Sequence, residues 1–340
     1  MTKLTSYVSM SRRIRPLKAA PRVWNYVKYR ALPRQAVTSY ARTSPQIASL
    51  LLTKRCNLNC SFCNVGGFMH DKGTTWQSME ADLEKVQRIF ANPLFSKALL
   101  VDLLGGEPLL VKDLGRIVAF LSERGHLTNM ATNGVLLAGR IRELKEAGIS
   151  RVSVSVYDDN LTALERDMPS INNVLPVHAS MVLFRHEVDQ APDRIVQTAR
   201  FLKDVGCLDL RFWIYRPIGE HPDPGEILFE DDPALLAFRR RMEEAVPGFC
   251  FWPAPAKKGP VRKLCPQLWQ RVGCDMAGNL GVCCGTDEFL PTPGGNLFEG
   301  DPDKVFNHPL LVGMREQLLD PVAAPPEMCK SCNLLGDPGW

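Results

Sequence analysis

The chain has 340 residues, of which 45% are hydrophobic and 23% are charged, the composition of an ordinary globular protein. This length suits one large domain, or one domain with a small appendage. No apolar run reaches the ~18 residues of a membrane helix, and no signal-peptide segment opens the chain. Collagenous, disordered and membrane-spanning classes are therefore excluded, and we expect a cytoplasmic location.

Positive charge is concentrated at the start of the chain. Residues 1–70 carry 12 Lys and Arg side chains and no Asp or Glu, whereas the remainder carries 29 basic and 37 acidic side chains. We treat residues 1–46 as a basic N-terminal arm. Such an arm predicts either contact with an anionic partner, such as a nucleic acid or a membrane surface, or a solvated helical strap across the acidic body.

Residues 47–216 are predicted to form alternating strands and helices. The six apolar segments of strand length are 47–53, 98–104, 127–132, 151–157, 177–184 and 208–215. Helical spacing recurs between them at 79–90, 114–124, 137–147 and 193–205, with Asp113 as an N-cap and a shorter segment near 161–166. This alternation predicts a parallel sheet, as an open doubly wound sheet or an incomplete barrel, with ligands at the carboxyl ends of the strands.

Two of these strands indicate which side chains face inward. In the fourth strand valines alternate with Ser153 and Ser155, so we expect the valines to pack against the helices and the serines to point inward. The same alternation turns Arg211, Trp213 and Tyr215 of the sixth strand inward. A polar interior is typical of a lined cavity rather than a packed barrel core.

The regular alternation stops after Arg216. Residues 217–264 are rich in proline and contain one helix candidate at 233–245. Residues 265–340 are rich in Gly and Cys and have little apolar periodicity. We expect them to form a small domain stabilised by bound metal.

Eleven cysteines in a chain without secretory features favour metal or redox chemistry over disulfides. The first group, Cys56, Cys60 and Cys63, follows the first strand directly. Three thiolates can ligate three irons of a [4Fe–4S] cluster and leave the fourth iron open. A zinc site with His70 as fourth ligand is the alternative.

Three motifs stand at the carboxyl ends of the first three strands. They are Cys56-x3-Cys60-x-Phe62-Cys63, Gly105-Gly106-Glu107-Pro108 and Thr132-Asn133-Gly134. Together they resemble the radical S-adenosylmethionine (radical SAM) superfamily over residues 47–216. The resemblance implies a partial (β/α)6 barrel whose open iron binds SAM.

The resemblance also implies roles for individual residues. The turn Gly105–Pro108, including Gly106 and Glu107, would receive the SAM amino group, and Phe62 would lie beside the adenine. We expect Ser153 and Ser155 at the ribose, with Asn133 as a further contact, although small serines also suit a tight barrel interior. One electron from a flavodoxin- or ferredoxin-type donor would release a 5′-deoxyadenosyl radical, which takes hydrogen from the substrate.

A second cysteine group lies in the C-terminal segment. Its spacing resembles a shortened SPASM (twitch-like) domain holding one auxiliary [4Fe–4S] cluster, with ligands Cys265, Cys283, Cys329 and Cys332. Zinc is again the alternative, and Cys284 can replace Cys283. The remaining cysteines are expected to be buried hydrophobes. One of them, with Cys274 or Cys284 favoured, can instead return a hydrogen atom to a product radical.

Arg185, Arg211, Tyr215 and Arg216 are predicted to surround the mouth of the cavity. Arginine forks suit carboxylate or phosphate groups, and aromatic faces suit sugar or base rings. The structural alternative for the arginines is ion pairing with Asp158, Asp159 or Asp209.

We therefore expect an oxidoreductase or lyase acting on a small anionic sugar, cyclitol or nucleoside in antibiotic biosynthesis, by dehydrogenation, elimination or epimerisation. The first alternative is a maturase of peptides, and the second is a non-catalytic iron–sulfur electron-transfer protein. The cyclase of molybdenum-cofactor synthesis ranks lower, because residues 336–340 do not match its arginine–glycine tail.

Overall fold

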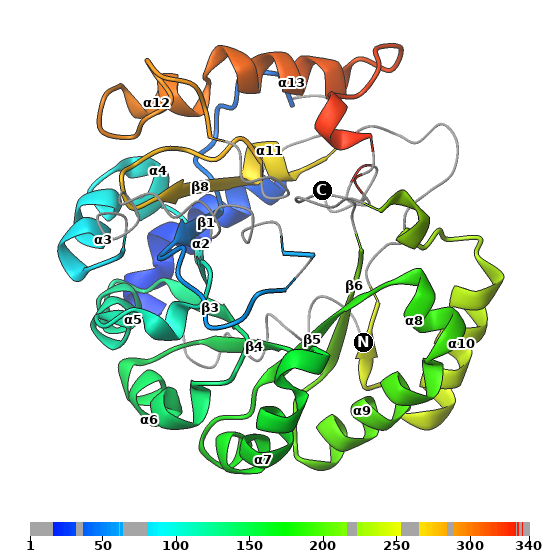
Figure 1. The fold of residues 1–340 in the computed structure, drawn as a ribbon. Coiled ribbons are helices and arrows are strands. Elements are labelled where there is room, and N and C mark those ends of the chain that lie inside the picture. The colour runs from blue at the N-terminus through cyan, green and yellow to red at the C-terminus, as the bar shows by residue number, and fades with distance from the viewer. Residues whose placement is uncertain are drawn as a thin grey trace.

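The computed structural model describes residues 16–31, 37–60, 62–63, 80–215, 223–252, 265–283, 289–330, 332 and 335. One sheet of eight strands lies at its centre, in the order β7-β6-β5-β4-β3-β2-β1-β8. Every neighbouring pair is parallel. In Figure 1 the sheet curls into an open ring with helices around its outside. The predicted parallel α/β fold is confirmed, and its curled sheet agrees with a partial barrel.

All six predicted strands are present. They are β1 (Ile47–Leu51), β2 (Leu100–Leu104), β3 (Leu127–Thr132), β4 (Arg151–Ser155), β5 (His178–Leu183) and β6 (Leu210–Ile214). Two further strands, β7 (Cys250–Phe251) and β8 (Arg271–Asp275), were not expected. Because β8 pairs with β1 from Ile47↔Arg271 onward, the cysteine-rich C-terminal segment contributes a strand to the barrel sheet itself.

Helices connect the strands and cover the outer side of the sheet. The α-helices are α2 (Pro16–Ala31), α3 (Leu83–Phe90), α4 (Pro93–Ser96), α5 (Leu114–Glu123), α6 (Leu137–Ala147), α7 (Asp158–Val174), α8 (Arg185–Gln190), α9 (Pro192–Asp204), α10 (Pro233–Ala245), α11 (Gln267–Gln270), α12 (Pro302–Phe306) and α13 (Pro309–Leu319). Short 3-10 helices are η4 (Pro108–Leu110), η5 (Pro224–Glu226) and η6 (Glu327–Cys329). None of the helices in the described part of the chain has the length and apolar character needed to cross a membrane.

Three local predictions differ from the structure. The segment near 161–166 belongs to α7, a helix of 17 residues that continues through Pro169 because Leu164, Met168 and Ile171 bury one face. Helix α8 was not predicted. The Asp113 side chain does not cap its own helix; its carboxylate accepts a hydrogen bond from Leu83 N at the start of α3.

Side chains alternate between the two faces of the sheet as expected. The β4 valines are at most 1% exposed, and Phe212 of β6 packs outward against Phe238 and Trp252. On the inner face a polar chain crosses five strands through Arg271, Ser49, Asp102, Asn129 and Ser153. Arg271 Nη1 lies 2.6 Å from Ser49 Oγ and 2.5 Å from Asp102 Oδ2. Asn129 continues the chain from Asp102 to Ser153.

A fully buried arginine fastens the C-terminal segment to the barrel. The Arg315 guanidinium on α13 donates to the carbonyl oxygens of Leu268 (2.8 Å), Phe306 (3.0 Å) and Ser39 (3.3 Å). Burial lowers the pKa of Arg315 to about 10. These contacts join α13, the residues that lead into β8 and the segment before β1 into one body.

Candidate functional site

The segment that leads from β1 to the first cysteines is held by the turn after β2. Gly106 N donates to Thr53 O and Glu107 N donates to Arg55 O, both at 2.8 Å. A Cβ atom on Gly105 would lie 2.4 Å from Thr53 O, and one on Gly106 would lie 2.2 Å from Arg55 O. The two glycines are therefore required for the close approach that positions the cysteine loop.

Glu107 joins the ends of β2 and β3. Its side chain is 0% exposed, and its carboxylate accepts hydrogen bonds from Leu109 N (2.9 Å), Thr132 Oγ1 (2.7 Å) and Asn133 N (2.8 Å). Burial raises the pKa of Glu107, against the effect of these donors. Because the carboxylate is enclosed, we assign it a positioning role. Contact between this turn, where Pro108 begins η4, and a SAM amino group stays a prediction.

Cys56, Cys60 and Cys63 are half-buried on the loop after β1. Cys56 Sγ accepts hydrogen bonds from Leu58 N (3.5 Å) and Asn133 Nδ2 (3.7 Å). Burial raises the pKa of Cys56 and raises that of Cys60 to about 11, and the neighbouring Cys63 adds to both shifts. The three thiols therefore lie close enough for the charge on one to affect the pKa of Cys56 and Cys60.

The chemistry of this donor set suits iron–sulfur ligation, since three thiols and no carboxylate occupy the loop. Within the residues that the structure describes, no three His, Cys, Asp or Glu side chains lie close enough together to hold a metal ion. The assignment of Cys56, Cys60 and Cys63 as ligands therefore stays a prediction. His70, the proposed fourth ligand of a zinc site, lies outside the described residues.

Four aromatic rings line up across the carboxyl ends of the strands. Phe62 of the cysteine loop lies 4.9 Å from Tyr157 after β4 and 5.2 Å from Phe184 after β5, measured between ring centroids. Phe184 in turn lies 4.7 Å from Tyr215 after β6. The cysteine loop is thereby packed against the ends of β4 and β5, and Phe184 connects it to Tyr215 at the end of β6. Whether Phe62 also lies beside an adenine remains a prediction.

The two serines of β4 are half-buried and already have partners. Ser153 Oγ donates to Asn129 Oδ1 (3.3 Å). The Ser155 side chain is hydrogen-bonded to that of Tyr157, and burial raises the pKa of Tyr157 to about 12. Their expected inward direction agrees with the structure, while ribose contact stays a prediction.

The predicted substrate arginines are engaged in structural contacts. Arg185 donates to Gly225 O (3.1 Å) and Ile227 O (2.8 Å) and forms an ion pair with Asp232. Arg211, at the amino end of β6, pairs with Asp209 at 3.1 Å. This geometry favours the ion-pairing alternative for both arginines, with Asp232 an unforeseen partner.

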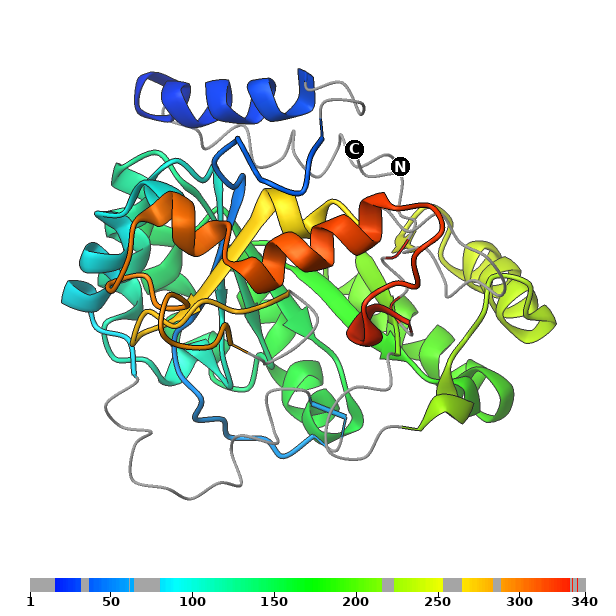
Figure 2. The same ribbon diagram turned by 90° about the horizontal axis from the view of Figure 1, so that it is seen from above.

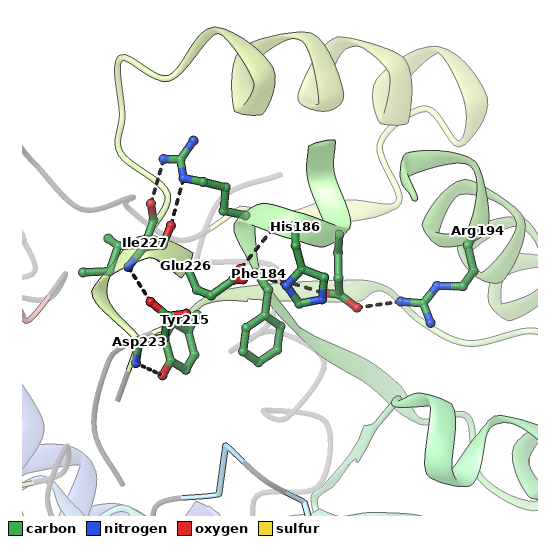
Figure 3. A network of polar contacts seen from close by, with 10 residues as sticks. Phe184, His186, Arg194, Tyr215, Asp223, Glu226 and Ile227 are labelled. Atoms are coloured by element: carbon green, nitrogen blue, oxygen red, sulfur yellow. Dashed lines mark hydrogen bonds and ion pairs between the residues drawn. The ribbon is translucent and has the colours of Figure 1, made fainter. Parts of the chain in front are cut away.

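The other two predicted substrate residues are Tyr215, which the structure describes, and Arg216, which it does not. Tyr215 is 6% exposed, and its hydroxyl accepts a hydrogen bond from Asp223 N at 3.2 Å, as Figure 3 shows. It lies at the carboxyl end of β6, so it can form a wall of the site. Arg216 lies outside the described residues.

One exposed titratable side chain at this end was not foreseen. His186, the second residue of α8, pairs with Glu226, whose Oε2 lies 2.9 Å from His186 Nδ1 and 3.0 Å from His186 N (Figure 3). Its ring centroid lies 5.6 Å from that of Phe184. The signal in the sequence was an imidazole three residues after the end of the fifth strand. The arrangement leaves an oriented imidazole beside the aromatic line.

The second cysteine group occupies the segment that α13 fastens to the barrel. Cys265 and Cys329 are buried, and Cys283 and Cys332 are half-buried. Cys332 N donates to Cys329 O, which closes the turn between them. Their ligand roles stay predictions, and Cys284 lies outside the described residues.

Cys274 is enclosed in β8. It is 3% exposed, and burial raises its pKa well above the usual value. Cys207 is likewise buried and accepts a hydrogen bond from Asn172. Both fit the expected buried hydrophobe, and the enclosure of Cys274 argues against its alternative role as a hydrogen donor.

Comparisons with known proteins agree with this geometry. Residues 50–210 match the model of the Radical SAM superfamily. The chain is 33% identical over 189 residues to GTP 3′,8-cyclase of Aquifex aeolicus, covering 51% of this chain and 58% of that protein. It is 31% identical over 186 residues to GTP 3′,8-cyclase of Listeria monocytogenes, covering 49% of this chain and 53% of that protein. The chain thus spans between half and three fifths of these curated relatives.

Two solved structures show the same fold. Streptococcus suis SuiB bound to precursor peptide SuiA superposes with a TM-score of 0.61 at 17% identity, over 88% of this chain and 72% of that one. Histidine-tagged anSMEcpe with bound AdoMet gives 0.59 at 15% identity, over 86% of this chain and 85% of that one. At these identities the likeness extends to the fold alone.

The fold and the candidate site together indicate a class of protein that has a parallel α/β barrel and a three-cysteine loop at the end of the first strand. The match over residues 50–210, just under half of the chain, supports a relation to the Radical SAM superfamily. A relation to this superfamily implies SAM and a SAM-binding [4Fe–4S] cluster as cofactors. The family and the cyclase relatives both indicate an enzyme.

Proposed function

We propose that the protein is a radical SAM enzyme that acts on a small anionic substrate containing a sugar ring. The observation that carries this proposal is the convergence of the three motifs. The Gly105–Glu107 turn holds the segment entering the cysteine loop, and Asn133 contacts Cys56. With its cofactors bound, such a site supplies a carbon-centred radical that removes hydrogen from an unactivated C–H bond.

Residues of the chain would bind the cofactors and shield the reaction from water. Cys56, Cys60 and Cys63 would ligate three irons and leave the fourth for SAM. The aromatic line that includes Phe62 and Tyr215 would cover the site and exclude water. His186, oriented by Glu226, would add a polar side chain at the mouth of the site.

The substrate class rests on the relatives more than on the arginines. Arg185 and Arg211 have internal partners, so they no longer support an anion site. The relatives are named for a cyclisation of GTP, which is an anionic nucleotide with a ribose ring. This similarity favours the nucleoside end of our expected class.

A cyclase acting on a nucleoside triphosphate is therefore the second candidate function. It is favoured by the identity of 33% over 189 residues and of 31% over 186 residues to these relatives. Residues 336–340 do not match the arginine–glycine tail of the molybdenum-cofactor cyclase, but the point at which a sequence ends carries no weight against this similarity. A peptide maturase stays the alternative, since SuiB shares only the fold.

We further propose that Cys265, Cys283, Cys329 and Cys332 hold a closed auxiliary [4Fe–4S] cluster. Support comes from the four thiols themselves and from Arg315, which ties their segment to the barrel. A flavodoxin- or ferredoxin-type donor, a cytoplasmic location and a role in antibiotic biosynthesis complete the proposal.

The test is a turnover assay on anaerobically reconstituted protein. Reduced protein is incubated with SAM and, separately, with GTP, sugar phosphates, nucleosides and peptides, and 5′-deoxyadenosine is measured by mass spectrometry. We expect 5′-deoxyadenosine in the wild type, stimulated by an anionic nucleoside or sugar, and none in Cys60→Ala. An iron-loaded wild type that forms none would instead support the electron-transfer alternative, and stimulation by peptides alone would support the maturase.

A further inference from the structure

Helix α2 lies across the amino ends of the barrel strands and is the outermost element there (Figure 2). One face is packed: Ala19 and Tyr29 are 0% and 4% exposed. Asn25 Nδ2 donates to Lys97 O at 3.1 Å, just before β2. A Cβ on Gly125 would lie 2.7 Å from the Lys18 backbone, so the helix touches the turn before β3. The orientation of α2 on the barrel is therefore fixed.

The opposite face of α2 is apolar and exposed. It consists of Ala20, Val23, Trp24, Val27 and Ala31, whose spacing places them on one stripe of a helix. Val23, Trp24 and Val27 are 36%, 59% and 45% exposed. The other large exposed hydrophobic side chains of the described residues lie singly on separate elements, so this stripe is the one place where they gather.

Positive charge flanks the stripe. Lys18, Lys28 and Arg30 are exposed on α2, and Lys28 Nζ lies 5.5 Å from the centre of the Trp24 ring. No acidic residue occurs in the first 70 residues of the chain. A helix with Trp and Val on its outer face and only basic charges beside them matches an anionic lipid surface.

We propose that α2 docks the protein on anionic membranes, with the apolar stripe in the headgroup region and the basic side chains on lipid phosphates and carboxylates. A protein partner or a second copy of the chain would need both acidic side chains and pockets that fit the stripe. An anionic bilayer already provides negative headgroups and an apolar interior. The inference is independent of the proposed function.

This docking fixes how the site faces the membrane. Helix α2 touches the residues that precede β1, β2 and β3, through Pro45, Lys97 and Gly125. The cysteine loop follows the carboxyl end of β1, at the other end of the sheet. The mouth would therefore face away from the lipid and stay open to substrate and electron donor.

The test is flotation of the full chain with vesicles of phosphatidylcholine alone or with about 30% phosphatidylserine, an anionic lipid of the kind the basic side chains would contact. Val23→Gln/Trp24→Gln/Val27→Gln removes the stripe, and Lys18→Gln/Lys28→Gln removes two charges. Leu236→Gln/Leu310→Gln is the matched control, because those exposed leucines lie on α10 and α13. Thermal melting and multi-angle light scattering establish folding and oligomeric state for each variant.

We expect the wild type and the control to float only with phosphatidylserine and to be released by salt. The stripe variant should bind at least tenfold more weakly, and each lost charge should weaken binding roughly fivefold. Absence of wild-type binding, or equal binding by a folded stripe variant, overturns the proposal. The proposal is also overturned if the wild type is a dimer and the stripe variant is a monomer, because the stripe would then join two copies of the chain. Binding of the wild type to RNA without binding to vesicles would likewise overturn it.

Discussion

Asn133 Nδ2 lies 3.7 Å from the sulfur of Cys56, and the orientation of this amide is set by its other contacts. Asn133 Oδ1 accepts a hydrogen bond from Val135 N (3.1 Å), so the nitrogen faces the cysteine loop. There it also donates to Asn57 Oδ1 at 2.7 Å. A residue that the resemblance assigned to SAM is thus a hydrogen-bond donor to a predicted iron ligand.

Replacing this donor should change the reduction potential of the bound cluster. A hydrogen bond to a ligating sulfur stabilises the more negative, reduced form. Asn133→Leu should therefore shift the potential to a more negative value. The measurement is a redox titration followed by electron paramagnetic resonance, without SAM, with iron content confirming that the cluster has formed. Val135→Ala, which leaves the amide in place, is the control, and equal potentials in all three proteins would refute this role.

The Glu107 network should contribute measurably to stability. Glu107→Ala leaves three enclosed donors without their acceptor, so we expect the free energy of unfolding to fall by about 3 kcal/mol. Glu107→Gln keeps one acceptor oxygen and should lose less. Urea unfolding of the apo protein measures both. Wild-type stability in Glu107→Ala would show that the carboxylate does not join β2 to β3 in solution.

Gly106 should tolerate no side chain. In Gly106→Ala the new Cβ would meet Arg55 O, so the segment entering the cysteine loop must move away from β2. We expect this variant to fold but to bind far less iron on reconstitution. Gly139→Ala is the matched control, because a Cβ at this position of α6 meets nothing within 4 Å. It should keep wild-type iron content and gain up to about 1 kcal/mol of stability.

Acid should destabilise the protein through His126. Burial, together with the charges of Arg22 and Arg124, lowers its pKa to about 3, and its Nδ1 lies 2.8 Å from Ala98 O. Between pH 6.5 and 3 the unfolded chain binds a proton that the folded protein does not, so stability falls as pH decreases through that window. The loss between about pH 7 and about pH 4.5 should be about 2.5 kcal/mol.

Urea midpoints measured across this pH range test the effect. Carboxylates also contribute to acid sensitivity, so the informative quantity is the difference between wild type and His126→Gln. The variant should show a shallower decline. Parallel declines would mean that His126 is not held neutral beneath α2.

The local pattern of the sequence was enough to predict the six barrel strands and α6, which ends at Gly148 in the left-handed region (φ 89°). It was not enough for β7 and β8. Strand β7 has two residues, and β8 is defined by pairing with β1, more than 200 residues away. Pro169 concealed the length of α7, whose apolar face is stabilised by tertiary packing.

Within the candidate site, the sequence was enough to predict which residues lie there, but not which hydrogen bonds and ion pairs most of them form. Three cysteines after the first strand identify the loop, and the facing of Ser153 follows from strand alternation. The partner of Arg185, Asp232, lies on the loop before α10 and could not be read from local sequence. The enclosure of Glu107 likewise depends on β3. Arg211 was the exception, since its partner Asp209 is two residues away and had been named.

The Cys56–Cys63 loop is proposed to carry a cluster with one iron left open for SAM. The most direct measurement is the electron paramagnetic resonance spectrum of the reduced, reconstituted Cys329→Ala/Cys332→Ala protein, in which only the loop can hold a cluster. We predict about four irons per chain and a spectrum that changes when SAM is added. A fully loaded protein whose spectrum is the same with and without SAM would contradict the account.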